Sequence, residues 1–225
     1  MTRFKICGLR DPANALVAAR ADADFLGLNF VPGVRRQITP EQAMDIIDQV
    51  RREPAGDRPR LVGLFADQPF EEVNEIIRYC GLDMAQLCGE ETPRYWRKLA
   101  VPVIKQIKIR DDAGTGRAVA EAAVQIELVI ADGQTALLDK YEAGALGGTG
   151  RSFDRRTARE LAGRFDVVLA GGLTPENVGD AISEVRPWGV DVSSGVETDG
   201  VKDPAKIASF AREVGLAGGG TDKPA

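Results

Sequence analysis

Short apolar runs alternate along this chain with longer segments in which apolar residues recur every three or four positions. A short run bounded by turn residues indicates a buried strand, whereas the three-to-four spacing indicates a helix with one face on a core. Eight runs are predicted as strands, at residues 3–8, 25–30, 58–66, 84–87, 103–109, 136–139, 167–170 and 190–192. A helical segment follows each of them, beginning near residues 12, 40, 69, 93, 117, 154, 175 and 204.

Helix start signals support two of these segments. Thr39 precedes Pro40, and Thr174 precedes Pro175, so each threonine is expected to cap a helix whose first residue is the proline. The fifth helical segment is ambiguous at its end, because residues 128–131 are apolar enough to form a strand of their own. We interpret them as the end of the helix.

Eight strand–helix units in succession predict a parallel sheet. Because they occupy a chain of 225 residues, we expect the sheet to close into a single (β/α)8 barrel, also called a TIM barrel. The predicted catalytic domain covers residues 1–215, and residues 216–225 are expected to form a flexible C-terminal tail. In such a barrel the functional residues lie at the carboxyl ends of the strands.

Composition narrows the class of function. The net charge is −5 and there is no long basic block, which argues against nucleic acid as a partner. No apolar run approaches the ~20 residues that span a bilayer. No signal peptide is evident, so we expect a cytoplasmic protein without a membrane partner. The three cysteines lack paired spacing, which predicts neither disulfides nor a metal site, and the absence of histidine leaves proton transfer to other side chains.

Two loops in the last third of the chain are rich in glycine and serine, and each follows one of the last two predicted strands. Backbone N–H groups and hydroxyls that no Cβ obstructs suit a phosphate dianion. Either loop alone is typical of a tight strand-to-helix turn, but the two together favour phosphate binding. The candidate residues are Gly171, Gly172, Ser194 and Gly195.

Three further side chains near strand ends are candidates for chemistry. Cys7 ends the first strand and can act as a base if neighbouring N–H groups or positive charge lower its pKa. Asp139 ends an apolar run, whose low dielectric is expected to raise its pKa so that it holds a proton. Such an acid–base pair suits an isomerase. The guanidinium of Arg36 can bind a carboxylate, although a surface role is the commoner one for an arginine in a loop, and Arg35 is expected to face solvent. The other two cysteines are interpreted as small buried hydrophobic residues.

These residues lie in motifs that resemble those of the phosphoribosylanthranilate isomerase family of tryptophan biosynthesis, from about residue 5 to about residue 210. The order and spacing of the first cysteine motif and the last serine motif are specific to that family. The motifs are Lys5-Ile6-Cys7-Gly8, Arg36 with Ile38, Val62-Gly63-Leu64-Phe65, Gln86-Leu87 with Gly89-Glu90, Leu137-Leu138-Asp139, Gly147-Gly148-Thr149-Gly150 with Phe153-Asp154, Ala170-Gly171-Gly172-Leu173 with Pro175-Glu176-Asn177-Val178, and Asp191-Val192-Ser193-Ser194-Gly195-Val196-Glu197.

The resemblance implies a barrel that converts N-(5-phosphoribosyl)anthranilate to 1-(2-carboxyphenylamino)-1-deoxyribulose phosphate by an Amadori rearrangement, without any cofactor. It implies that Asp139 is the general acid that opens the furanose to a Schiff base, and that Cys7 is the general base that removes the C2 proton. Arg36 then holds the anthranilate carboxylate. The phosphate-binding residues that it implies are Gly148, Gly171, Gly172, Ser194 and Gly195. The partner is a small phosphoribosyl molecule, and the protein is a monomer or a homodimer.

Some positions depart from the family pattern. Cys88 stands where the family usually has histidine, Val34 where a serine is common, and Arg155 where tryptophan often follows. Asp132 is a rival for the general acid, although Asp139 lies at the family's spacing from the glycine loop. Two other functions are left open: a phosphosugar isomerase of the histidine-pathway type, which works with two aspartates and is disfavoured by Cys7, and a barrel that binds phosphosugars without turnover.

Overall fold

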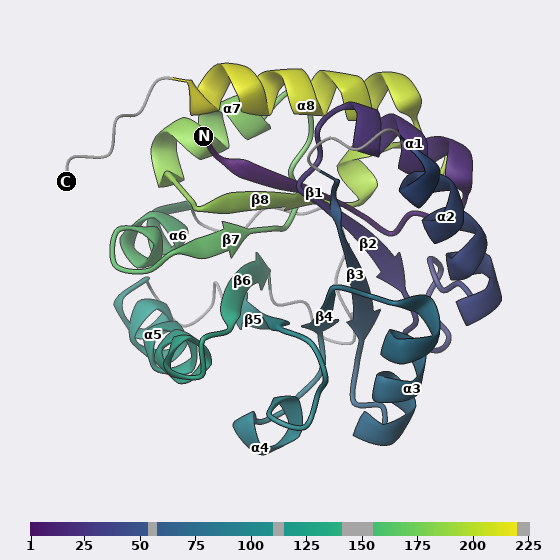
Figure 1. The fold of residues 1–225 in the computed structure, drawn as a ribbon. Helices are drawn as coiled ribbons and strands as arrows, with labels where there is room; N and C mark the ends of the chain where they lie inside the picture. The colour runs from purple at the N-terminus through teal and green to yellow at the C-terminus, as the bar shows by residue number, and fades with distance from the viewer. Residues whose placement is uncertain (54–57, 110–114, 141–154, 220–225) are drawn as a thin grey trace.

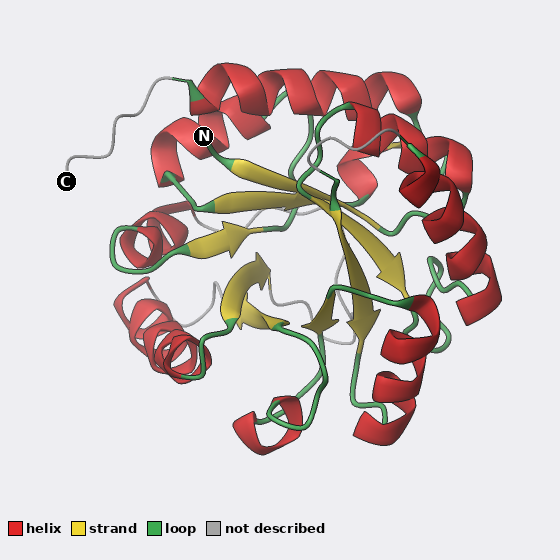
Figure 2. Ribbon diagram, viewed as in Figure 1, coloured by secondary structure: helices red, strands yellow, loops and turns green. Residues whose placement is uncertain are grey.

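The structure, a computed structural model, describes residues 1–53, 58–109, 115–140 and 155–219. In this part of the chain, parallel strands β1 to β8 form a closed barrel, and the helices surround it (Figures 1 and 2). The strands are β1 (Arg3–Cys7), β2 (Phe25–Asn29), β3 (Arg60–Phe65), β4 (Met84–Leu87), β5 (Val103–Ile109), β6 (Thr135–Lys140), β7 (Val167–Leu169) and β8 (Gly189–Val192). The helices are α1 (Pro12–Arg20), α2 (Pro40–Arg52), α3 (Phe70–Cys80), α4 (Pro93–Trp96), α5 (Thr115–Ala131), α6 (Arg155–Ala162), α7 (Val178–Val185) and α8 (Pro204–Gly218). The predicted (β/α)8 barrel is confirmed.

Strand β1 closes the ring, because it pairs in parallel with β2 on one side and with β8 on the other. In this register Lys5 lies opposite Phe25 of β2 and opposite Asp191 of β8. Side chains two residues apart on a strand point to the same face. Lys5 and Cys7 therefore share one face of β1, and the barrel places them beside Asp191.

The barrel interior changes from apolar to polar along the strands. Toward the amino-terminal ends of the strands, the interior holds a cluster of buried apolar side chains next to Trp188. The residues of that cluster are Phe25, Val62, Met84, Ile104, Leu137, Val168 and Ala170. Two residues further along the strands, the same faces present Gln86, Gln106 and Asp139. The period of two thus carries polar side chains to the carboxyl ends of the strands, above a packed apolar plug.

The predicted helix starts are confirmed at α2 and wrong at α7. Thr39 caps α2 in a capping box, in which its hydroxyl accepts from the backbone of Gln42 and the Gln42 side chain accepts from the backbone of Thr39. Helix α7 begins at Val178, not at Pro175, because the side chain of Asn177 accepts a hydrogen bond from the N–H of Thr174 and donates to the carbonyl of Gly172. These bonds hold 174–177 as a turn before the helix.

The remaining boundaries follow the sequence closely. Residues 128–131 are the end of α5, as interpreted, and no strand forms there. Helix α8 runs to Gly218, three residues beyond the predicted domain end at 215, so the expected tail is helical at its start. Residues 220–225 of that tail, and the glycine-rich loop 144–150, lie outside the described residues. Among the described helices, none combines the length and the apolar character that crossing a bilayer requires.

Candidate active site

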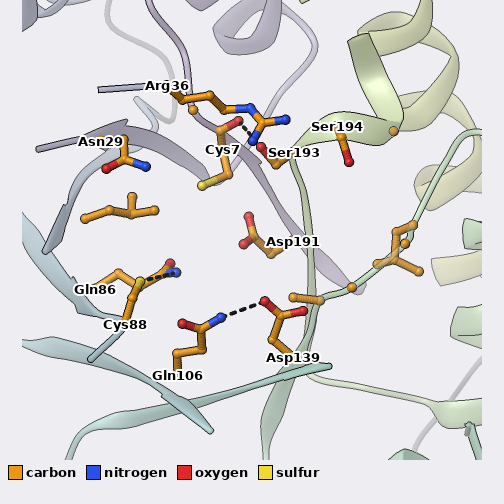
Figure 3. A pocket seen from close by; sticks show the side chains of 17 residues that line it. Cys7, Asn29, Arg36, Gln86, Cys88, Gln106, Asp139, Asp191, Ser193 and Ser194 are labelled. Atoms are coloured by element: carbon orange, nitrogen blue, oxygen red, sulfur yellow. Dashed lines mark hydrogen bonds between the residues drawn. The ribbon is translucent and has the colours of Figure 1, made fainter. Parts of the chain in front are cut away.

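A cavity opens at the carboxyl ends of the strands. Figure 3 shows Cys7 on one side of it and Asp139 on the other, with Asp191 between them in this view. Each of the eight strands, or the loop that follows it, contributes to the lining. The lining residues are Cys7, Gly8, Asn29, Arg36, Leu64, Gln86, Cys88, Gln106, Asp139, Ala170, Gly171, Gly172, Leu173, Asp191, Ser193, Ser194 and Gly195. Seven of the eight predicted site residues therefore meet in one cavity; the eighth, Gly148, lies outside the described residues.

The Cys7 thiol lies above a buried ion pair. Lys5 donates from Nζ to Oδ1 of Asp191 at 3.0 Å, and both side chains are almost completely buried. Gly27 of β2 makes this packing possible, because a Cβ there would lie 2.9 Å from Sγ of Cys7 and 3.2 Å from Cε of Lys5. Lys5 and Asp191 both belong to motifs named above, but no role was predicted for either from the sequence. The period of two was the available signal, since Lys5 precedes Cys7 by two positions on the same strand face.

The sequence made a lowered pKa the condition for Cys7 to act as a base, but the structure raises that pKa. Burial raises the pKa of this thiol above its ordinary 9.0, and the Asp191 carboxylate raises it further. The ammonium groups of Lys5 and Lys202 act to lower it, but burial outweighs them. For Lys5, burial acts to lower the pKa, yet the charges of Asp191 and Cys7 raise it above its ordinary value, so this ammonium keeps its proton.

Asp139 has the raised pKa that its sequence context predicted. Burial lifts the pKa of this carboxyl from 3.8 to about 6, and the nearby Asp191 charge adds to the effect. Two hydrogen bonds oppose the rise: Oδ2 accepts from Nε2 of Gln106 at 2.6 Å, and Oδ1 accepts from the backbone N–H of Lys140 at 2.8 Å. The carboxyl is thus fixed in orientation and holds a proton more readily than an exposed aspartate does.

Asp132, the rival for the general acid, lies between α5 and β6, at the opposite end of the barrel from the cavity. Its carboxylate accepts from Trp96 Nε1 and forms a two-bond pair with Arg97. Those hydrogen bonds, together with the charge of Arg97, lower its pKa. Asp132 is therefore an ionised structural residue, and Asp139 is the carboxyl in the cavity.

Arg36 reaches the cavity rim from the loop between β2 and α2 (Figure 3). Its Nε and Nη2 donate to the two carboxylate oxygens of Glu197 at 2.7 and 2.9 Å. Arg35 is exposed, as expected, but it also contacts Glu197, from Nη2 at 2.6 Å. The sequence analysis assigned no role to Glu197, which belongs to the last motif, and did not single out Lys202, which also contacts it.

The two glycine and serine loops lie against each other. Gly171 and Gly172 both have positive φ, of 89° and 66°, a conformation that glycine adopts without strain. Gly195 lies so close to the backbone carbonyl of Leu173 that a Cβ has no room. The hydroxyl of Ser193 donates to the Cys7 carbonyl at 3.2 Å, which joins this loop to β1. The loops can therefore offer backbone N–H groups and the Ser194 hydroxyl to one anion.

The other two cysteines differ in position. Cys80 is buried at the end of α3 in the outer core, where its thiol lies 3.7 Å from the Pro40 carbonyl. Cys88 is also buried, as interpreted, but it lines the cavity and lies 3.5 Å from Nε2 of Gln86. Burial raises its pKa to about 12, so it is neutral. Among the described residues, no group of three or more Cys, Asp and Glu side chains is arranged to hold a metal ion.

Comparison with known proteins agrees with this geometry. Residues 4–213 match the profile of the family described as N-(5'phosphoribosyl)anthranilate (PRA) isomerase. An N-(5'-phosphoribosyl)anthranilate isomerase of Dehalococcoides mccartyi is 41% identical over 97% of this chain and 98% of its own length. The corresponding protein of Roseiflexus castenholzii is 45% identical over 92% of this chain and 95% of its own length.

Solved structures extend the likeness to three dimensions. The phosphoribosyl anthranilate isomerase of Thermotoga maritima superposes with a TM-score of 0.80 at 33% identity, covering 96% of this chain and all of that one. A structure of such an isomerase in complex with reduced 1-(o-carboxyphenylamino)-1-deoxyribulose 5-phosphate gives a TM-score of 0.77 at 33% identity and the same coverage. The profile and the relatives each span nearly the whole barrel. The chain therefore belongs to the N-(5'-phosphoribosyl)anthranilate isomerase family.

Proposed function

We propose that this chain isomerises N-(5'-phosphoribosyl)anthranilate to 1-(o-carboxyphenylamino)-1-deoxyribulose 5-phosphate, as a step of tryptophan biosynthesis. The observation that carries the proposal is the placement of Cys7 and Asp139 on opposite sides of one cavity (Figure 3), whose lining also includes Arg36 and the two small-residue loops. The substrate offers two anionic ends, a carboxylate and a phosphate. An arginine and a set of loop N–H groups suit these two ends.

Asp139 is the proposed general acid. Its proton passes to the furanose ring oxygen, the bond from that oxygen to C1 breaks, and the anilino nitrogen forms a double bond to C1. A pKa of about 6 keeps part of the Asp139 population protonated near neutral pH. The hydrogen bonds from Gln106 and the Lys140 backbone then stabilise the carboxylate that remains.

Cys7 is the proposed general base. As a thiolate it removes the proton from C2, which the adjacent iminium makes more acidic, and the electron pair forms a C1–C2 double bond. The resulting enolamine tautomerises to the ketone. Lys5 supports the thiolate, because its charge acts against the burial that raises the pKa of Cys7. This chemistry uses side chains of the protein alone, and the proposal includes no cofactor.

The reactive form combines a protonated Asp139 with an ionised Cys7. It holds the same number of protons as the form with Asp139 ionised and Cys7 neutral, so both forms share one pH dependence. Activity is therefore expected to rise through the lower pKa, that of Asp139, and to fall through the higher one, that of Cys7. The proposal also includes a cytoplasmic location, action as a monomer or a homodimer, and no nucleic acid partner.

The test is turnover by the wild-type protein. Freshly generated phosphoribosylanthranilate is fluorescent, and its decay with enzyme is followed while the product is identified by mass and by coupling to indole-glycerol-phosphate synthase. Conversion to the deoxyribulose product is expected. Well-folded protein that leaves the substrate unchanged refutes the proposal.

A further inference from the structure

The carboxylate of Glu197 lies at the meeting point of three cationic side chains at the cavity rim. Arg36 donates to both of its oxygens, at 2.7 and 2.9 Å. Arg35 adds a contact of 2.6 Å, and Nζ of Lys202 adds one of 2.9 Å. The Glu197 carboxylate is only 6% exposed. Burial acts to raise its pKa, but the hydrogen bonds and charges of Arg36 and Lys202 outweigh burial and hold the pKa at about 2. Glu197 is therefore a permanent anion.

The cluster joins two loops that come from distant parts of the chain. Arg35 and Arg36 lie between β2 and α2, whereas Glu197 and Lys202 lie in the short hairpin of β9 (Glu197–Thr198) and β10 (Val201–Lys202) that follows β8. Nζ of Lys202 also donates to the Ser193 carbonyl at 2.8 Å. One carboxylate thus connects the arginine at the rim, through a buried lysine, to the loop of the proposed phosphate site.

The geometry of Arg36 leaves a second edge of its guanidinium for a ligand. A guanidinium is a planar fork that meets a carboxylate with two parallel N–H bonds. Glu197 takes the edge formed by Nε and Nη2, so the edge that carries Nη1 faces elsewhere. Arg36 lines the cavity, and a Cβ on Gly8 would collide with its Cδ, so the stem of the side chain packs against Gly8 at the end of β1.

Charge supports the same conclusion. Three cations surround one carboxylate, so the cluster carries a net positive charge, and its member that lines the cavity is Arg36, the residue proposed to meet the substrate carboxylate. A flexible arginine loses side-chain entropy when a ligand fixes it, whereas one already held in place does not. Holding Arg36 in advance is thus expected to strengthen carboxylate binding.

We propose that Glu197 is a positioning residue, which holds Arg36 so that its remaining edge meets the substrate carboxylate and which fixes that edge relative to the phosphate loop through Lys202. This inference rests on the proposed function. It predicts a selective effect: replacing Glu197 weakens recognition of the carboxylate and leaves recognition of the rest of the substrate intact.

The experiment compares two stable ligands, prepared by reductive amination of ribose 5-phosphate with anthranilate or with aniline. They differ only in the carboxylate. Dissociation constants are measured by calorimetry for wild type and for Glu197→Gln. The substitution is expected to raise the dissociation constant of the carboxylated ligand about tenfold or more, as loss of a charge-assisted contact does. Binding of the ligand without the carboxylate is expected to stay within about twofold.

Controls separate positioning from a general structural role. Glu53→Gln breaks a similar two-bond pair with Arg20, far from the cavity, and is expected to leave the dissociation constants of both ligands unchanged. When Glu197→Gln is added to Arg36→Met, the affinity for the carboxylated ligand is expected to fall no further. If Glu197→Gln does not fold, Glu197→Asp, whose shorter side chain reaches fewer partners, tests the same selectivity.

Each other outcome overturns the inference. If Glu197→Gln lowers the affinity for both ligands equally, Glu197 has a structural role. If it lowers neither affinity, Arg36 needs no support from Glu197. Tighter binding of the carboxylated ligand shows that Glu197 competes for Arg36. Wild type that binds neither ligand refutes the proposed function itself, whereas wild type that binds both and loses no selectivity in the variant refutes the role of Glu197 alone.

Discussion

The substitution Asp139→Asn is expected to stabilise the fold while it removes the proposed acid. An asparagine side chain has nearly the shape of a protonated aspartate. Its oxygen can accept from the Lys140 N–H, as Oδ1 of Asp139 does. When the Gln106 amide turns over, so that Oε1 replaces the Nε2 that faces Asp139, the asparagine NH2 can donate to Oε1, a buried atom without a hydrogen-bond partner in the described structure. The variant therefore avoids burying a charge without giving up the local hydrogen bonds.

The magnitude follows from the pKa of Asp139, which burial raises from 3.8 to about 6. Because the folded state binds this proton more tightly than the unfolded state, ionisation destabilises the folded state as the pH rises. The penalty is absent below about pH 4, grows between 4 and 6, and is complete above 6. At 1.36 kcal/mol per pKa unit, its upper limit is about 3 kcal/mol.

Urea unfolding of wild type and Asp139→Asn at a series of pH values between 4 and 8 measures this penalty. The free energy of unfolding of the variant is expected to exceed that of wild type by a margin that grows between about pH 4 and 6 and then stays level up to pH 8, at no more than about 3 kcal/mol. Groups that titrate equally in both proteins cancel in the difference. A difference that does not change with pH, or a variant that is less stable at pH 8, refutes the reasoning about Asp139.

Three other outcomes are expected. Lys5→Met leaves Asp191 charged and buried, so urea unfolding should show a loss of about 3–5 kcal/mol; a loss below about 1 kcal/mol contradicts the ion pair's importance. Gly195→Ala has no room for its Cβ, so the two loops must move apart and KM should rise; an unchanged KM contradicts a ligand site there. In a pH profile, kcat/KM should rise near pH 6 with the ionisation of Asp139. Gln106→Met removes a hydrogen-bond donor from the Asp139 carboxylate, which raises the pKa of Asp139, so this rise should shift to higher pH. A limb that falls near pH 6 contradicts the assignment.

The fold was predictable because its signals are local. Each strand is a short apolar run, and the spacing of the runs left a barrel as the natural closure. The misplaced start of α7 shows the limit of such signals: Thr174 and Pro175 form a plausible helix start, but Asn177 holds them in a turn through bonds to Thr174 and Gly172. Competition between two local hydrogen-bond patterns is decided by their surroundings, not by either pattern alone.

The sequence predicted the site residues that lie at strand ends. It did not predict the residues that act by holding or charging another side chain. Cys7 is the last residue of β1 and Asp139 the last but one of β6, so the barrel rule placed them in the cavity. Lys5 and Asp191 are 186 residues apart in sequence, and only closure of the ring pairs them. Glu197 likewise meets Arg36 across 161 residues. The raised pKa of Cys7 has the same origin, because burial is a property of the assembled barrel.

The central claim is that Cys7 and Asp139 act as a base and an acid without histidine. Its most direct test is kcat/KM for phosphoribosylanthranilate in wild type and in Cys7→Ala, with circular dichroism to confirm that both fold. Removal of a general base is expected to lower kcat/KM by about 10²–10⁴-fold. A Cys7→Ala protein that folds and keeps its activity within about threefold of wild type contradicts the claim, because another group then removes the C2 proton.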